Sequence, residues 1–434
     1  MKAVISNRIY LNVDEELKKK LMAELTYKIP KKYVKGSKMK QYEIIRTYKN
    51  ISPTIMSIPA GRLDLVPEHY EIVDKRIHTE EYPFPVPLLQ PREDQAVVIR
   101  DASGNSIINA QPGWGKTFTA LLLAHKLGQP TLVVCHTTQL RDQWIEEAKK
   151  MFGIDVGIIG GGEMDIDDHI LCIGNVQTVT KFSEKLAKHF GTLILDEMHH
   201  VSAETFRDII DNSYARYKIG LSGTLNRTDG KHVLFRDYFG TEIHQPSQNN
   251  ILDPTIELYN TGVWLEPGGN WATKVNKLLY DEDYQAMIAL IAAREIGKGE
   301  KVLILADRVE FLENVTELLN GACLCITGKV DDYDERKRLL QEIYDGTKQA
   351  IAGSRQIFTE GISVNPLSCL IIATPTANPI LLEQAIGRIQ RLCEGKFTCK
   401  VIDIGLGGPD GRKHRKERVE FYQRKGWDIK EYKV

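Results

Sequence analysis

The sequence lacks a long apolar segment and a surplus of charge of either sign, and both absences bear on the class of protein that we expect. No apolar run approaches the roughly 20 residues that a helix needs to cross a bilayer. The first twenty residues, MKAVISNRIYLNVDEELKKK, contain no apolar core of a secretion signal. With 57 Lys and Arg against 58 Asp and Glu, the net charge of −1 neither supports nor excludes a nucleic-acid partner. We therefore expect a cytoplasmic globular protein.

Paired cysteines are also lacking. The seven cysteines are odd in number and include no Cys-x-x-Cys pair, which favours a reducing compartment over a disulfide framework. Cys323 and Cys325 are alternate residues of an expected strand, which indicates core thiols rather than metal ligands. At 434 residues the chain is longer than a single hydrophobic core ordinarily accommodates, so two or three domains are expected.

Basic residues gather at the two ends of the chain. The first fifty residues carry thirteen basic and five acidic side chains, and they include KIPKKYVKGSKMK at 28–40. The last stretch contains GRKHRKERVEFYQRKG at 411–426. Each stretch is either a solvated charged face or a nucleic-acid surface, and composition alone leaves both open.

The N-terminal part reads as a small α+β domain. Residues 4–13 alternate like a strand, and Asp14 is placed to cap a helix that runs to about Tyr27. Strand-like runs follow at 42–49, 54–58 and 70–77. The proline-broken EEYPFPVPLL at 80–89 and HQPSQNNILDPT at 244–255 mark breaks in the chain. We predict an accessory domain at 1–86, a domain at 87–245, a linker at 246–270 and a last domain at 271–434.

Both larger parts alternate apolar strand runs with helical patterns, which is typical of a parallel sheet covered by helices. The runs of the first part are SIINA, TLVVCH, HILCIGN, TLILDE and KIGLSGT. Those of the second are KVLILAD, CLCIT, QAIAGS, CLIIATP and CKVIDI. The fold class is therefore α/β, with two parallel-sheet domains in tandem.

A glycine loop follows the first of these strands, in AQPGWGKTFTALLLA at 110–124. Gly113 and Gly115 allow the backbone to turn its N–H groups towards an anion, and the helix that begins there adds partial positive charge. Lys116 supplies a full charge, and the Thr117 hydroxyl can bind Mg²⁺. Ala110 stands where the strict nucleotide-binding pattern has glycine. The alternative is an ordinary glycine turn with a surface lysine.

Two adjacent carboxylates end the strand run TLILDE. In a phosphate-loop architecture, Asp196 fits the role of holding Mg²⁺, and Glu197 that of orienting and deprotonating the attacking water. A helix N-cap is the alternative for the pair. His199 and His200 are candidate metal ligands, but no Cys or carboxylate partners stand at ligand spacing.

A third group of polar residues lies in QAIGRIQR at 384–391. On a helix, Gln384, Arg388 and Arg391 fall on one face at i, i+4 and i+7, and Gly387 permits close approach. Two arginines so placed suit a charge clamp on a transferring γ-phosphate, with ATP between the two halves of the chain. A basic surface helix is the alternative.

In this order, the motifs resemble those of the superfamily 2 helicases. AQPGWGKT matches that family's AxxGxGKT form of the Walker A motif, so that Ala110 fits the pattern, and DEMH at 196–199 resembles its DEAH-type box. PREDQ at 91–95 resembles the adenine-reading segment, and SGT at 222–224 the motif that couples hydrolysis to strand contact. CHTTQLRDQW (135–144) and GNVQT (174–178) resemble the backbone-contacting motifs. The segments that resemble motifs of the second motor domain are ADRVEFLENV (306–315), TG (327–328), FTEGISV (358–364) and QAIGRIQR.

The resemblance covers nearly everything after about residue 88 and implies two RecA-like motor domains that use ATP and Mg²⁺. It implies catalytic roles for Lys116, Asp196, Glu197, Arg388 and Arg391, with Mg²⁺ on Thr117 and Asp196. The implied nucleotide contacts are Arg92, Gln95, Pro112, Gly113, Trp114, Gly115, Lys116, Thr117, Gly361 and Gln384. The implied nucleic-acid contacts are Thr137, Gln139, Gln177, Thr178, Arg227 and Thr359. Coupling roles fall to His199, Ser222 and Thr224.

GTLNRTDGKH at 223–232 resembles an Arg-x-Asp segment of the XPB and UvsW branch, which acts on DNA. The N-terminal part, ending SIPAGRLDLVPEHY, resembles the accessory DNA-recognition domain of that branch, and the small size favours its phage fork-remodelling members. The resemblance implies a monomeric ATP-dependent DNA helicase that acts on forks and Holliday junctions in replication and recombination, in the host cytoplasm, with little sequence preference. A duplex translocase without strand separation and an RNA helicase are the alternatives. Ser363 departs from the family, in which many members have an acidic residue.

Overall fold

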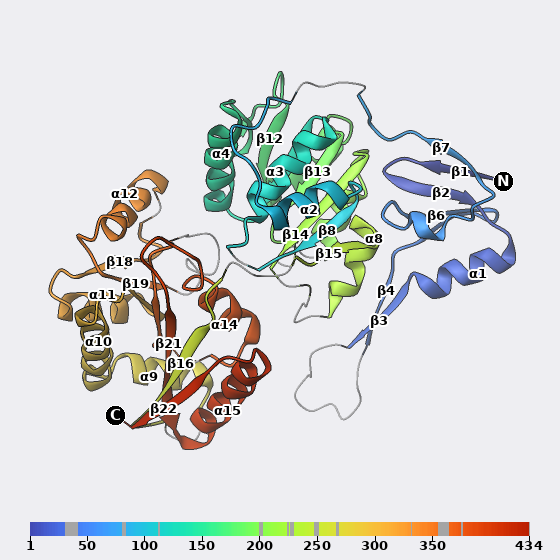
Figure 1. Ribbon diagram of the computed structural model, residues 1–434. Coiled ribbons are helices and arrows are strands. Elements are labelled where there is room, and N and C mark those ends of the chain that lie inside the picture. Colours follow the sequence, from blue (N-terminus) through green and yellow to red (C-terminus); the bar gives the residue numbers. More distant parts are fainter. Residues whose placement is uncertain are drawn as a thin grey trace. The chain divides into compact units, whose positions relative to one another are not determined.

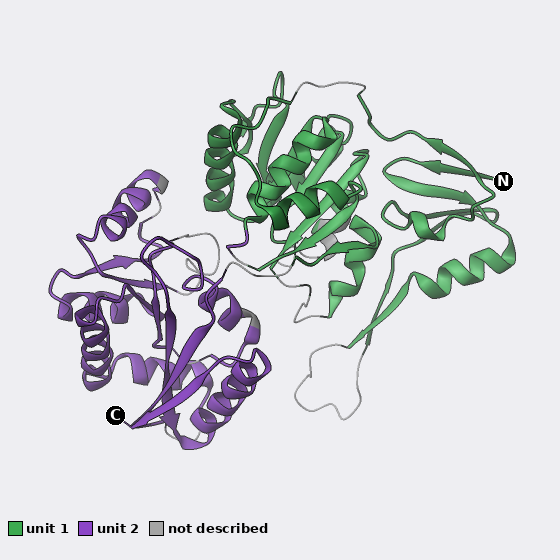
Figure 2. Cartoon of the chain, in the orientation of Figure 1, with its two compact units in different colours: residues 1–111, 115–247 green, residues 112–114, 248–434 purple. Residues whose placement is uncertain are grey.

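The computed structural model describes residues 1–30, 42–79, 84–111, 113–198, 203–223, 225, 230–246, 251–265, 269–330, 332–354, 364–374 and 376–433. The chain forms two compact units, which Figure 2 colours separately. Unit 1 comprises residues 1–111 and 115–247, and unit 2 comprises residues 112–114 and 248–434. Each unit contains one large, mostly parallel sheet, and unit 1 also carries a small N-terminal sheet (Figure 1). This architecture confirms the predicted α/β class with a small α+β N-terminal part.

The N-terminal module of unit 1, residues 1–79, contains a five-stranded sheet in the order β5-β6-β2-β1-β7. Its strands are β1 (Lys2–Ile5), β2 (Arg8–Asn12), β5 (Lys49–Ser52), β6 (Ile55–Pro59) and β7 (Glu71–Asp74). A separate hairpin pairs β3 (Thr26–Pro30) with β4 (Tyr42–Arg46). Buried side chains from the sheet, among them Ile9 and Met56, form one cluster with Leu21 of helix α1 (Glu15–Glu24).

Two bounds predicted for this module were wrong, although Asp14 caps α1 as expected, by accepting a hydrogen bond from the N–H of Leu17. Residues 4–13 form two strands because the N–H of Ser6 bonds to the carbonyl of Arg8 and turns the chain back. The helix ends at Glu24 because β-branched and aromatic residues favour the extended hairpin strand that starts at Thr26.

The large sheet of unit 1 has the order β11-β10-β12-β9-β13-β14-β8-β15. Among the described residues, β10 and β11 pair antiparallel and every other neighbouring pair is parallel. The five predicted strand runs are confirmed as β8 (Ser106–Asn109), β9 (Thr131–Cys135), β12 (Leu171–Asn175), β13 (Thr192–Leu195) and β14 (Tyr217–Ser222). The remaining strands are β10 (Gly157–Gly160), β11 (Glu163–Met164) and β15 (Glu242–His244).

Helices cover this sheet (Figure 1). The longer ones are α2 (Glu93–Asp101), α3 (Lys116–Leu127), α4 (Thr138–Phe152) and α7 (Ala203–Ile210). The shorter ones are α5 (Val176–Lys181), α6 (Ser183–Leu186) and α8 (Phe235–Phe239).

Two buried carboxylates, Asp237 in α8 and Asp211 directly after α7, join the N-terminal module to the helices of the large-sheet part of unit 1. Arg8 Nη1 lies 2.6 Å from Asp211 Oδ2, and both side chains are almost fully buried. Asp237, which is fully buried, accepts hydrogen bonds from side chains of three module residues, namely Tyr27 (2.9 Å), Thr47 (2.5 Å) and Arg62 (3.2 Å). Buried charges that lose a partner are costly, so these contacts hold the module in one place on the first large sheet.

The large sheet of unit 2 has the order β18-β19-β17-β20-β21-β16-β22, and its described neighbours all pair in parallel. Its strands are β16 (Pro254–Trp264), β17 (Val302–Ala306), β18 (Cys323–Ile326), β19 (Ala350–Ser354), β20 (Cys369–Ile372), β21 (Cys399–Gly407) and β22 (Ile429–Lys433). The segment predicted as a linker at 246–270 thus contains an interior strand. Its alternating apolar residues, Ile256 and Leu258, are buried in the core.

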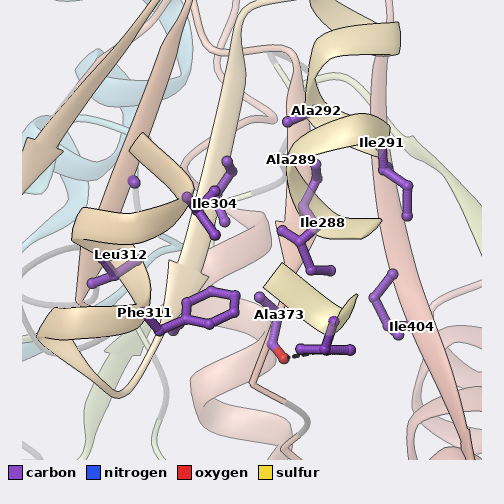
Figure 3. Close-up of a cluster of buried hydrophobic side chains, with 14 of the residues drawn as sticks. Ile288, Ala289, Ile291, Ala292, Ile304, Phe311, Leu312, Ala373 and Ile404 are labelled. Atoms are coloured by element: carbon purple, nitrogen blue, oxygen red, sulfur yellow. Dashed lines mark hydrogen bonds between the residues drawn. The ribbon is translucent and has the colours of Figure 1, made fainter. Parts of the chain in front are cut away.

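The core of unit 2 packs helices onto the sheet. Figure 3 shows Ile288 of α10 (Glu282–Gly297), Phe311 of α11 (Val309–Leu318) and Ile304 of β17 directed into one cluster. The other helices are α9 (Trp271–Leu279), α12 (Tyr333–Tyr344), α14 (Pro379–Ile386) and α15 (Gly408–Arg424). Within the part of the chain that the structure describes, no helix has the length and apolar character of a membrane span.

Candidate nucleotide and nucleic-acid site

The candidate site residues of unit 1 follow the carboxyl ends of its parallel strands. β8 leads into the glycine loop, β9 into Thr137, β12 into Gln177 and β13 into Asp196, and β14 ends at Ser222. Because these strands are parallel neighbours, the sheet gathers all five positions at one edge. Ligands of open α/β sheets bind at this edge.

The glycine loop has the backbone that phosphate binding requires. Gly113 and Gly115 have φ values of 90° and 97°, in the left-handed region that favours glycine, and α3 begins immediately afterwards at Lys116. A Cβ atom on Gly115 would lie 2.5 Å from Nε2 of Gln95, so the loop passes directly against that side chain. The indole of Trp114, within the loop, is buried.

The lysine and the two carboxylates predicted to act together are close in unit 1. Lys116 Nζ donates to the carbonyl of Ala110 at 3.0 Å and lies 3.4 Å from Oε1 of Glu197. The strand β14 stands between β8 and β13, so the two motifs are on next-nearest strands rather than on neighbours. Ala110 also donates its N–H to the carbonyl of Ser222 at 3.0 Å, which ties the start of the loop to the coupling motif.

Asp196 is held by two hydrogen bonds. The indole N–H of Trp144 donates to Oδ2 at 2.7 Å, and the N–H of Glu197 donates to Oδ1 at 2.9 Å. Burial, and then the charge of Glu197, raise the pKa of Asp196 to about 6, and the Trp144 bond and Lys116 oppose that rise. Glu197 itself has φ 42°, a left-handed conformation that is uncommon outside glycine and is typical of functional sites.

These residues fit a divalent cation. Two adjacent carboxylates, of which Asp196 is buried, lie beside one ammonium, and added positive charge there would stabilise the ionised state of Asp196. Mg²⁺ prefers such oxygen ligands together with a hydroxyl and substrate phosphates. Thr117 supplies a half-buried hydroxyl one residue after Lys116. No cluster of three His, Cys, Asp or Glu residues suited to a metal occurs among the described residues, so the cation would depend on the hydroxyl and the phosphates as well as the carboxylates.

The segment expected to read adenine lies at the start of α2. The backbone N–H of Arg92 donates to Oε1 of Gln95 at 3.0 Å, and the Gln95 side chain is buried. The guanidinium of Arg92 pairs with Asp94 at 3.2 Å on the surface. The structure brings both side chains to the glycine loop, because a Cβ atom on Gly115 would lie 2.5 Å from Nε2 of Gln95 and 3.8 Å from Nη1 of Arg92.

The candidate nucleic-acid contacts of unit 1 lie at the ends of the neighbouring strands β9 and β12. Thr137 is the N-cap of α4, where its hydroxyl accepts the N–H of Leu140 at 3.2 Å. The Thr137 hydroxyl acts as the acceptor in this bond. Gln177 is exposed at the start of α5, whereas Gln139 and Thr178 are half-buried.

The helix predicted through 384–391 was wrong. α14 ends at Ile386, and the chain continues in a tighter turn in which Arg388 bonds its N–H to the carbonyl of Ala385 at 3.2 Å. Gly387, a poor helix former, stands at the change. The one-face spacing of Gln384, Arg388 and Arg391 therefore does not hold. Gln384 and Arg388 are buried, and Arg391 forms a bridge with Ile251 within unit 2.

Several predicted positions lie outside the described residues, namely Pro112, His199, His200, Thr224, Arg227, Thr359, Gly361 and Ser363. The structure also adds a residue that the sequence reasoning did not single out. Trp144 is 1% exposed and contacts Asp196 through its N–H, although its only sequence signal is its position at the end of CHTTQLRDQW.

Comparison with known proteins identifies the family to which these motifs belong. The family model "Type III restriction enzyme, res subunit" matches residues 88–227, and "Helicase conserved C-terminal domain" matches residues 282–393. "Probable helicase D10" of Escherichia phage T5 is 40% identical over 438 residues, covering 98% of this chain and 95% of that protein. "DNA 3'-5' translocase XPB2" of Sulfurisphaera tokodaii is 27% identical, covering 80% of this chain and 90% of that protein.

A solved structure shows the same fold. Dbp5 of S. cerevisiae bound to RNA and ADP BeF3 superimposes with a TM-score of 0.56 at 15% identity, covering 80% of this chain and 90% of that chain. At this low identity the similarity concerns the fold alone. It agrees with two tandem parallel-sheet motor domains.

Proposed function

Because this chain belongs to the superfamily 2 helicases, which use ATP to act on nucleic acid, we propose that its substrate is branched DNA, such as forks and Holliday junctions. The observation that carries the proposal is the N-terminal module, which is basic in sequence and fixed by buried ion pairs to the first motor sheet. A module held in this way adds a second nucleic-acid surface that moves with the first motor domain. The printed name of the XPB2 relative, a DNA translocase, supports DNA as the polymer.

The hairpin β3–β4 offers a surface suited to DNA. In its antiparallel register, Lys28 pairs with Ile44 and Thr26 with Arg46, so that these side chains share one face with Tyr42. Lys28, Tyr42, Ile44 and Arg46 are all exposed. Two cations beside an aromatic ring suit phosphate contacts combined with base stacking.

For hydrolysis, we assign the γ-phosphate and its metal to the loop and the two carboxylates. Lys116 neutralises phosphate charge, Thr117 and Asp196 hold Mg²⁺, and Glu197 orients and deprotonates the attacking water. Mg²⁺, when bound, neutralises charge on the phosphate oxygens. Gln95 contacts the nucleotide beside the loop, and Ser222 couples the loop to the strand-contacting edge through its bond to Ala110.

Unit 2 is assigned the positive charge that stabilises the transition state. Arg388 and Arg391 act on the γ-phosphate, with Gln384 as a further nucleotide contact. Their backbone is held by turn bonds after α14 and by the bridge to Ile251, which fixes the points at which both side chains leave the chain. Arg391→Ala should therefore bind ATP and hydrolyse it poorly. Loss of ATP binding in that variant would contradict the clamp role.

The test is a substrate panel of fork, Holliday junction, D-loop, tailed duplex and plain duplex, each scored for ATPase stimulation and strand release. We expect branched DNA to stimulate most, and Lys116→Ala to abolish turnover on every substrate. Lys149→Ala, an exposed lysine at the far end of α4, is the matched control and should behave as wild type. Equal stimulation by plain duplex and branched DNA would refute the substrate proposal, and normal ATPase in Lys116→Ala would refute the mechanism.

A second variant tests the module itself. Charge reversal of Lys28 and Arg46 to Glu should reduce the preference for branched DNA while basal ATPase persists, because neither residue lies at the nucleotide edge of the sheet. Reversal of Lys149 and Lys150, both exposed on α4, controls for the change in net charge. An unchanged preference would show that the hairpin face does not bind DNA.

A duplex translocase that leaves strands paired is the second candidate, and the name of the XPB2 relative favours it. Displacement of a triplex-forming strand without release of a duplex strand would select this function. RNA arms in the same ATPase assay test the remaining alternative, and stimulation by RNA above that by DNA would overturn DNA as the substrate.

A further inference from the structure

In unit 1, helix α4 connects one of the proposed nucleic-acid contacts with the carboxylate pair. Its N-cap is Thr137, one of the proposed nucleic-acid contacts, and two turns later it carries Trp144. Residues seven apart lie on the same side of a helix. Trp144 is 1% exposed, and its N–H reaches across to Oδ2 of Asp196 at 2.7 Å.

The contact controls the orientation of one carboxylate. Oδ1 of Asp196 accepts the N–H of its own neighbour, Glu197, at 2.9 Å, and Oδ2 accepts the indole N–H from a separate helix. With both oxygens held, rotation about the bond between Cβ and the carboxyl carbon is restricted. Without the indole donor, the buried oxygen would lose a charge-assisted hydrogen bond and the carboxylate could turn.

We propose that Trp144 is a positioning residue for ATP hydrolysis. It holds the Asp196 carboxylate in the orientation that the phosphate-bound cation needs, and it transmits displacements of α4 to that carboxylate. The second part rests on the proposed function, because it takes nucleic acid at Thr137 as the cause of the displacement. No step requires Trp144 to touch substrate.

A purely structural role for the ring would give a different result, so the test must separate its shape from its N–H. Site-specific incorporation of benzothienylalanine at position 144 replaces the N–H by sulfur and keeps the two fused rings. Incorporation of 7-azatryptophan keeps the N–H. Trp144→Phe is a simpler variant that removes the donor and part of the ring.

With benzothienylalanine we expect the kcat of ATP hydrolysis to fall roughly ten- to a hundredfold, the range for loss of a hydrogen bond to a charged group. The KM for ATP should remain within about twofold, because the loop and Lys116 are intact, and half-maximal activity should require more Mg²⁺. Stimulation by DNA over the basal rate should also decrease. The 7-azatryptophan protein should retain wild-type kcat and Mg²⁺ response.

The same benzothienylalanine exchange at Trp427, which packs against the core of unit 2, is the matched control and should leave the kcat, the KM, the Mg²⁺ requirement and the stimulation by DNA unchanged. A wild-type kcat and Mg²⁺ response in the position-144 variant would overturn the positioning role. Lys116→Ala in the same assay separates the two proposals. If Lys116→Ala is inactive and the position-144 variant is normal, this inference fails alone, whereas turnover in Lys116→Ala would refute the hydrolysis mechanism itself.

Discussion

Replacing Asp196 by Asn should stabilise the ligand-free protein while abolishing ATP hydrolysis. The carboxylate is 5% exposed and lies beside Glu197, and these two causes, burial first, raise its pKa from 3.8 to about 6. The ionised form is therefore disfavoured in the folded protein. Asn has the same shape and can still accept the Trp144 N–H, but it carries no charge.

The magnitude follows from the size of the shift. A rise of about two pKa units corresponds to roughly 3 kcal/mol of differential free energy, at about 1.4 kcal/mol per unit. The sign is fixed by linkage: because the folded pKa is raised, the stabilising contribution is complete below the unfolded value of 3.8 and is lost as the pH rises through about 6. Asn cannot satisfy both donors, which costs about 1 kcal/mol at every pH. At pH 7.5, the free energy of unfolding of Asp196→Asn should then exceed that of wild type by about 2 kcal/mol.

Calorimetry of the ligand-free full chain between pH 4.5 and 7.5 measures this difference. For a unit of this size, about 2 kcal/mol corresponds to a rise in Tm of roughly 4–8 °C. The advantage of Asp196→Asn over wild type should grow by about 2 kcal/mol across that pH range. Asp208→Asn, which changes an exposed carboxylate in α7, is the matched control. A difference that does not vary with pH, or a variant that is less stable at pH 7.5, would refute the reasoning.

Three further outcomes concern buried charges elsewhere. Asp403→Asn should destabilise unit 2 by about 3–5 kcal/mol in urea unfolding, because the guanidinium of Arg418, 1% exposed, loses its charge partner. An unchanged urea midpoint would contradict this. Asp237→Asn should speed hydrogen exchange in β3 and β4, since the hairpin loses the carboxylate that Tyr27 contacts. Equal exchange rates in the variant and in wild type would show that the module is held by other contacts. Burial tends to raise the pKa of Glu295, but hydrogen bonds from basic neighbours outweigh it and lower the pKa to about 2. Unit 2 should therefore keep this stabilisation above pH 4.5 and lose it as the pH falls towards 2. In acid titration, Glu295→Gln should lose less stability than wild type over that window, and equal losses would contradict this. The basic neighbours are Lys298, Lys400 and Arg294.

The features that sequence alone determined are those encoded within a few neighbouring residues. Gly113 and Gly115 predicted positive φ because only glycine adopts it freely, and the structure shows it. The apolar runs predicted the parallel strands correctly because strands buried on both faces are apolar throughout. The order of the motifs also identified the family, since each motif is a short segment with its own chemistry.

The features that only the tertiary structure decided depend on residues far apart in the chain. Trp144 and Asp196 are 52 positions apart, and Tyr27 and Asp237 are 210 apart, so no local pattern predicts either hydrogen bond. The end of α14 at Ile386 and the strand β16 inside the expected linker are set by packing within unit 2. Local propensity is a weak preference that tertiary packing overrides, and the orientation of a buried carboxylate is decided by whichever donors the fold brings to it.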